Sequence, residues 1–236
     1  MDCRTFTALD TQLANMRVPM ETVPKNQINI GDLRVRLYGY FLTENNHRYK
    51  QFDKRNGDSF SIDFFPTKPD ISASLDDLSG VRDFYRQMLC PNGIGLLQCD
   101  VVEFCGMLAV SVVVKVRLEP TGLAFIGSYT IPRLHHSFVL KFQSAENGPT
   151  GVRETMVMAM HSDLEFDETT GKMIGWAADP YDATVQFPLM RNLADDEKYD
   201  SEFPDHPLTK TRLFMRELRK HVSISDRYRQ LPPFTP

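Results

Sequence analysis

The chain has 236 residues, of which 42% are hydrophobic and 25% charged, a balance typical of a globular protein rather than a disordered or fibrous one. Its 27 basic and 31 acidic residues give a net charge of -4, which argues against broad electrostatic binding to nucleic acid or to an anionic membrane. A chain of this length can bury a sizeable core without disulfides or metals.

Residues 1–31 predict a polar N-terminal arm with one helix at most. They carry Asp10 and Glu21 and no apolar core, so we expect no secretory signal. The most apolar window, residues 96–116, is interrupted by Asp100, whose charge disfavours a membrane span. The four cysteines show no CxxC spacing, which indicates reduced structural thiols. We therefore expect a soluble, cytoplasmic protein that contacts no membrane.

The next part of the chain predicts a hairpin followed by a helix. Alternating apolar and polar residues predict strands at residues 33–42 and 59–65. Asn56-Gly57 precedes the second strand and is a preferred turn pair, because both residues tolerate positive φ. Residues 74–89 place apolar side chains at helical spacing, with acids early and arginines late, so we expect a helix there.

Four strand-like runs follow that helix. They lie at residues 95–104, 107–118, 123–131 and 137–144. The breaks between them are too short for crossover helices, so neighbouring strands should pair directly as an antiparallel meander.

The last third of the chain combines helices with loops. Thr150 can cap one helix, and Asp205 can cap a final helix at residues 206–222. Between them, residues 163–205 predict an acidic, loop-rich excursion with one short strand at residues 173–177. Because no internal repeat or interdomain linker interrupts the chain, we expect a single α+β domain spanning all 236 residues. Its centre should be a mainly antiparallel sheet of about six strands with helices packed on it, like an αβα sandwich.

One helix start has the make-up of an anion site. Residues 148–154, with the sequence GPTGVRE, place two glycines and backbone amides there, so Gly151 and Arg153 are candidate ligand-binding residues. His135 and His136 are further candidates, although adjacent strand residues point to opposite faces and would need a third ligand to hold a metal. The spacing is not a Walker motif, and a lone glycine-rich helix start is usually an ordinary turn and cap.

Motifs for catalysis or metal binding are absent: the sequence has no GxSxG elbow, no HExxH and no EF-hand register. We therefore predict no catalytic residue, metal or cofactor. Within the acidic excursion, Asp195, Asp196 and Glu197 make a rim that could contact a basic protein partner. Residues 49–65 interleave aromatic and basic side chains, but acids dilute them, so we expect no nucleic-acid site there. An ordinary loop is the favoured interpretation, and a protein-binding strand edge is the alternative.

Several segments together resemble an uncharacterised bacterial family: a GSYTIP strand, an HSFVLKFQ strand, a GVRE helix and the run FPDHPLTKTR. The order of strands and helices over residues 33–160 also resembles the α/β sandwich of the PsbP and Mog-type group, whose members serve mainly as binding or assembly factors. The resemblance implies a binding or assembly role and assigns no site residue.

The sequence favours a non-enzymatic protein-binding, adaptor or assembly factor. The alternative is a small-ligand-binding protein or hydrolase that uses the turn at residues 148–154 with His135, His136 or His161. A pocket that unites Arg153 with a histidine would favour this alternative, whereas a flat apolar patch or a bare strand edge would favour the adaptor.

Overall fold

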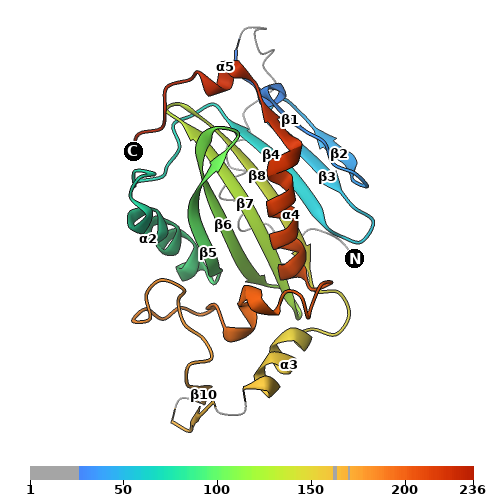
Figure 1. Cartoon of the computed structure of the whole chain (residues 1–236), viewed down its shortest axis with the longest axis vertical. Coiled ribbons are helices and arrows are strands. Elements are labelled where there is room, and N and C mark those ends of the chain that lie inside the picture. Colours follow the sequence, from blue (N-terminus) through green and yellow to red (C-terminus); the bar gives the residue numbers. More distant parts are fainter. Residues whose placement is uncertain (1–26, 162–163, 170) are drawn as a thin grey trace.

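The structure, a computed structural model, describes residues 27–161, 164–169 and 171–236, so most of the predicted N-terminal arm lies outside the described residues. A seven-stranded antiparallel sheet forms the centre, in the order β2-β3-β4-β8-β7-β6-β5 (Figure 1). Its strands are β2 (Phe41–Asn45), β3 (Tyr49–Asp53), β4 (Ser59–Phe65), β5 (Gly95–Phe104), β6 (Met107–Arg117), β7 (Leu123–Arg133) and β8 (His136–Ala145).

Two short strand pairs lie outside this sheet, and several helices surround it. The pairs are β1 (Leu33–Val35) with β11 (Val222–Ile224), and β9 (Phe166–Asp167) with β10 (Lys172–Met173). The α-helices are α2 (Leu78–Leu89), α3 (Val152–Met160), α4 (Pro207–His221) and α5 (Asp226–Arg229). Short 3-10 helices are η1 (Ile30–Asp32), η2 (Cys90–Asn92), η3 (Leu193–Asp195) and η4 (Glu197–Tyr199).

The α+β class and the predicted meander are confirmed. Strands β5 to β8 follow one another in the chain and are neighbours in the sheet. The alternation that predicted them is visible in β6, where Val110, Val112 and Val114 belong to one buried cluster, while Ala109 and Val113 face the other side.

The N-terminal strands differ from the prediction. The strand predicted at residues 33–42 is divided, because β1 leaves the main sheet to pair with β11 and β2 begins only at Phe41. The polar stretch predicted as a loop contains β3, which pairs with β4 across the Asn56-Gly57 turn. The main sheet therefore has seven strands instead of about six. The sequence pattern missed β3 because this strand has mostly polar side chains and no apolar run.

Helix α4 crosses one face of the sheet over β7 and β8 (Figure 1). Its residues Met215 and Leu218 are buried in a cluster with Phe142. The helix approaches the sheet closely at Gly127, where an added Cβ would lie 2.6 Å from Cγ of Met215. The hydroxyl of Tyr129 also donates to the carbonyl of Met215 at 3.0 Å. The missing side chain at Gly127 thus allows α4 to pack directly on β7.

Helix α2 covers the opposite face over β5. Its Val81, Tyr85 and Leu89 share a buried cluster with Cys99 and Val112. Since these strand residues point away from the α4 side, helices cover both faces of the sheet. The arrangement matches the predicted resemblance to an αβα sandwich.

The described residues 164–169 and 171–205 contain little regular structure. The strand predicted at residues 173–177 is reduced to the two residues of β10. The cap residue of both later helices lies one residue after the predicted one. Gly151 replaces Thr150 before α3, and His206 replaces Asp205 before α4, where its Nδ1 accepts the N–H of Leu208 at 3.2 Å. Among the described residues, no helix is long and apolar enough to cross a membrane.

Candidate functional site

Helix α3 connects the end of β8 to the excursion (Figure 1). Its two faces differ in burial. Gly151 starts the helix in the left-handed region, with φ of 70°. Arg153 and Val157 lie four residues apart on the buried face, whereas Val152 and Met156 are exposed. One short helix therefore carries both an internal polar site and an apolar outer surface.

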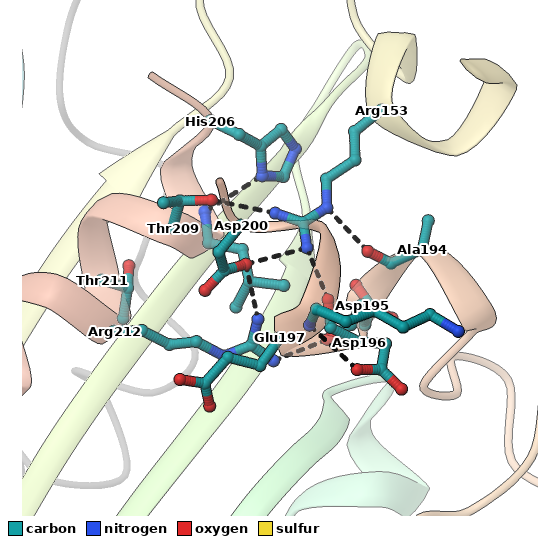
Figure 2. A network of polar contacts seen from close by, with 12 residues as sticks. Arg153, Ala194, Asp195, Asp196, Glu197, Asp200, His206, Thr209, Thr211 and Arg212 are labelled. Carbon is teal, nitrogen blue, oxygen red and sulfur yellow. Dashed lines mark hydrogen bonds and ion pairs between the residues drawn. The ribbon is translucent and has the colours of Figure 1, made fainter. Parts of the chain in front are cut away.

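The guanidinium of Arg153 is the centre of a buried network (Figure 2). Its Nε donates to the carbonyl of Ala194 at 2.6 Å, and Nη1 donates to the hydroxyl of Thr209 at 3.0 Å. Its Nη2 donates to the carbonyl of Asp196 and to Oδ1 of Asp200, both at 2.9 Å. With 1% of the residue exposed, Arg153 fixes the excursion to α3 and α4.

Two further ion pairs extend this network. Arg212 on α4 donates to Oδ1 of Asp200 at 2.9 Å and to the carbonyl of Asp195 at 2.6 Å. Lys115 on β6 donates to Oδ2 of Asp195 at 2.6 Å, and the two side chains are 1% and 2% exposed. Basic side chains from the sheet, α3 and α4 thus form buried ion pairs with aspartates of the excursion.

The predicted anion site at residues 148–154 is filled by the protein's own groups. The N–H of Gly151 donates to Oε1 of Glu146 at 2.9 Å, and the N–H of Leu123 donates to Oε2 at 2.8 Å. The donors of Arg153 are already engaged inside the network. The carboxylate of Glu146 therefore takes the place at the helix start that the sequence suggested for an external phosphate or carboxylate.

The predicted acidic rim is only partly at the surface. Asp195 is 1% exposed and engaged by Lys115, so it offers no contact surface to a partner. Asp196 is half-buried with an Arg191 nitrogen 3.5 Å away, and the exposed Glu197 pairs with Arg216. The rim consists of Asp196 and Glu197 alone, each already beside an arginine.

The predicted histidines lie far from Arg153. His135 and His136 are at the turn between β7 and β8, about 30 Å along β8 from the start of α3. The ring of His136 stacks on Phe64 with centroids 5.9 Å apart. At the other end of α3, Nε2 of His161 is 2.7 Å from the hydroxyl of Tyr199. The structure therefore does not bring these histidines together with Arg153.

A different histidine, His206, lies beside Arg153 (Figure 2). Burial, reinforced by the positive charge of Arg153, lowers the pKa of His206 to about 4, so its ring is neutral at pH 7. Its Nε2 is 4.0 Å from Oε1 of Glu146 and is buried with no hydrogen-bond partner in the described chain. The side chains of His206 and Glu146 are 9% and 5% exposed.

Glu154 completes this group from the first turn of α3. Apart from its own backbone N–H, its carboxylate has no donor among the described residues, and both oxygens are buried. Burial raises the pKa of Glu154, and the negative charges of Asp195 and Glu146 add to the effect. One ligand atom each from Glu146, Glu154 and His206 lies within 4.8 Å of the other two.

The outer face of α3 presents a row of apolar side chains. Val152, Met156 and Met160 are spaced by four residues and therefore lie along one side of the helix. They are 46%, 49% and 51% exposed. No charged side chain of the described α3 shares this face, because Arg153 and Glu154 turn inward.

Sequence reasoning missed Glu146 and His206, and it did not connect Asp200 with Arg153. Each lies in a polar stretch with no diagnostic spacing, and they come together only because the end of β8, the excursion and the start of α4 converge. The run FPDHP, in which His206 stands next to a helix-starting proline, is the single clue that was available, because such a residue sits at a helix cap.

No model of a known protein family matches the chain, and no curated protein matches it. Among solved structures, the chain is similar to PA94, a protein of unknown function from Pseudomonas aeruginosa, with 15% sequence identity and a TM-score of 0.32. The similarity covers 51% of this chain and 84% of PA94. A likeness at this level carries no argument about function.

Proposed function

We propose that the protein is a non-enzymatic binding protein, an adaptor or assembly factor, that contacts a protein partner through the outer face of α3. The supporting observation is the row of Val152, Met156 and Met160, each about half exposed. Exposed apolar rows of this kind are typical of contact surfaces, and methionine side chains adapt well to varied partners.

The chemistry around the row supports one class of partner. The row is about 12 Å long, which matches two turns of a partner helix. The hairpin of β9 and β10 follows α3 in the chain at the same end of the molecule, and it exposes Glu165, Phe166 and Glu168 (Figure 1). We therefore infer a partner segment that is an amphipathic helix with an apolar face and basic flanks.

A nine-residue helix covers less area than a stable self-association needs, since specific interfaces bury about 800 Å² on each side. This limit favours a partner that also contacts the hairpin over a second copy of the chain docked through α3 alone.

The test uses a labelled helical peptide with leucine on one face and lysine on the other, and measures binding by fluorescence anisotropy. We expect the double variant Met156→Gln, Met160→Gln to weaken binding at least about tenfold, since two buried apolar contacts are lost. Met88→Gln is the matched control, because Met88 is 38% exposed on α2. Binding should also weaken at high salt.

Two outcomes would reject this function. One is the same affinity for the double variant as for the unchanged protein. The other is equal binding of a peptide with the same leucine face and glutamate in place of lysine, which would contradict the charge of the inferred partner.

A further inference from the structure

Three side chains from the end of β8, from α3 and from the start of α4 converge at one place. Glu146 follows β8, Glu154 lies in the first turn of α3, and His206 caps α4. Their possible ligand atoms lie within 4.8 Å of one another. From these residues we propose a binding site for one divalent transition-metal cation of the zinc or manganese type, independent of the outer face of α3.

Unpartnered buried atoms are the first argument. Nε2 of His206 and both carboxylate oxygens of Glu154 are buried, and no other residue of the described chain hydrogen-bonds to them. Buried polar atoms are normally satisfied, because leaving them unpaired costs free energy. Only 9% of the His206 side chain is exposed, and its Nε2 lies 4.0 Å from Oε1 of Glu146. That distance is too long for a hydrogen bond and leaves room for a shared cation.

The surroundings hold the candidate ligands in place. Glu146 accepts backbone N–H groups from Leu123 and Gly151, one on each oxygen, and each oxygen keeps a second lone pair. The starts of α3 and α4 fix the backbone at Glu154 and His206, while the cap bond to Nδ1 of His206 has to open when a metal binds. Such supporting contacts are what orient the ligands of protein metal sites.

Charge around the site also favours a cation. The buried groups of this region are three bases and four acids, which leaves one excess negative charge. The bases are Lys115, Arg153 and Arg212; the acids are Asp195, Asp200, Glu146 and Glu154. Because the bases pair with the two aspartates, the excess lies at the two glutamates.

The ligand set selects the type of metal. Calcium and magnesium prefer oxygen ligands alone, whereas one imidazole with two carboxylates suits zinc, manganese or iron. Zinc binds nitrogen and oxygen at roughly 2.0 to 2.2 Å, so ligand atoms around one ion lie about 3 to 4 Å apart. The three groups must therefore close by up to about 1 Å from their present positions, a shift that side-chain rotation can supply.

Metal binding should change the tautomer of His206. In the structure, Nδ1 accepts the N–H of Leu208, so the proton of the neutral ring lies on Nε2. A metal on Nε2 requires the proton on Nδ1 and weakens the cap on α4. This exchange gives a signature, visible in the ring nitrogen resonances of His206, that binding to surface acids would not produce.

The experiment titrates metal-stripped full-length protein with zinc chloride and with manganese chloride, using calorimetry. We expect one ion per chain, and at least about tenfold weaker binding in Glu154→Gln and in His206→Asn, each of which removes one of three ligands. Asparagine at position 206 preserves a cap for α4, so this variant should fold. Glu217→Gln is the matched control, because Glu217 is 56% exposed on α4.

Manganese also locates the site, because it broadens nuclear resonances near it. Broadening around His206 and Glu154, with the tautomer change under zinc, would support the proposal. Absence of a one-to-one binding heat for both metals, or full affinity in both variants, would overturn it and leave a buried water or a proton as the group between the carboxylates.

Discussion

Lys115 Nζ lies 2.6 Å from Asp195 Oδ2 with both side chains almost fully buried, so the excursion is held to β6 by an ion pair inside the protein. Oδ2 of Asp195 also accepts the N–H of Asn192, which closes the turn that carries it. Removing one partner of a buried ion pair destabilises the fold, because it leaves the other partner as an uncompensated buried charge.

Lys115→Met should therefore lower the free energy of unfolding by about 3 to 5 kcal/mol, measured by urea denaturation. Adding Asp195→Asn to Lys115→Met should cost less than the sum of the two single changes, because the double variant carries no unpaired charge. Lys220→Met on the exposed side of α4 is the control, with an expected change of about 0.5 kcal/mol or less. Strict additivity would show that the two charges are not coupled.

Val157→Ala should loosen the excursion more than the sheet. Val157 is fully buried with Ala194 and Tyr199, and Trp176 packs against the same cluster. Loss of two methyl groups should cost about 1 to 3 kcal/mol. Since Trp176 is the single tryptophan of the chain, its fluorescence reports this region directly. An unchanged emission spectrum and unchanged unfolding midpoint would contradict the packing described for α3.

Gly127→Ala tests the close contact between α4 and β7. The added methyl group would lie 2.6 Å from Cγ of Met215 and 2.9 Å from Cγ2 of Thr211, so the helix must shift outward. We expect a loss of about 1 to 3 kcal/mol in unfolding free energy by thermal or urea denaturation. Met215→Ala shortens the opposing side chain. Adding Gly127→Ala to Met215→Ala should therefore lower the free energy of unfolding less than Gly127→Ala does in the unchanged protein. A neutral Gly127→Ala would show that α4 has room to move.

Acid should weaken the contact between the N-terminal and C-terminal parts of the described chain. Burial alone would raise the pKa of Asp32, but hydrogen bonds from Ser225, the backbone of Asn29 and Arg227 outweigh it, so the pKa of Asp32 is lowered. A lowered pKa in the folded state stabilises the fold above the ordinary pKa of 3.8 and loses this contribution as pH falls through the lower value.

Asp32→Asn should thus reduce stability near pH 6 and reduce the loss of stability between pH 5 and pH 2, measured by urea unfolding at a series of pH values. The control is Asp226→Asn, because the Asp226 side chain is 79% exposed and its surface pair with Arg229 contributes little. Equal pH profiles for Asp32→Asn and the unchanged protein would disprove the role of this carboxylate.

The sequence predicted local features well. The meander from β5 to β8 follows from alternating residues and short breaks, and α2 follows from its helical spacing, because both depend on neighbours in the chain. Strand β1 could not be separated from β2 by pattern alone, since its partner β11 lies near the other end of the sequence. The candidate site was predicted less well for the same reason.

Arg153 shows this limit clearly. Its position after a glycine at a helix start suggested an anion ligand, but Asp200 and Thr209 engage its guanidinium and Glu146 accepts the amide of Gly151. Local sequence can reveal that a helix start favours an anion. It cannot reveal that the anion is a carboxylate of the same chain.

The pairing of β1 with β11 has a consequence for the order of folding. The β5 to β8 hairpins join segments that are adjacent in the chain, so their loops close at small entropic cost. The contact of Leu33 with Ile224 encloses nearly the whole described chain and must wait until the sheet and α4 have brought its ends together. Amide protons of β11 should accordingly gain protection from exchange later in refolding than those of β6 and β7.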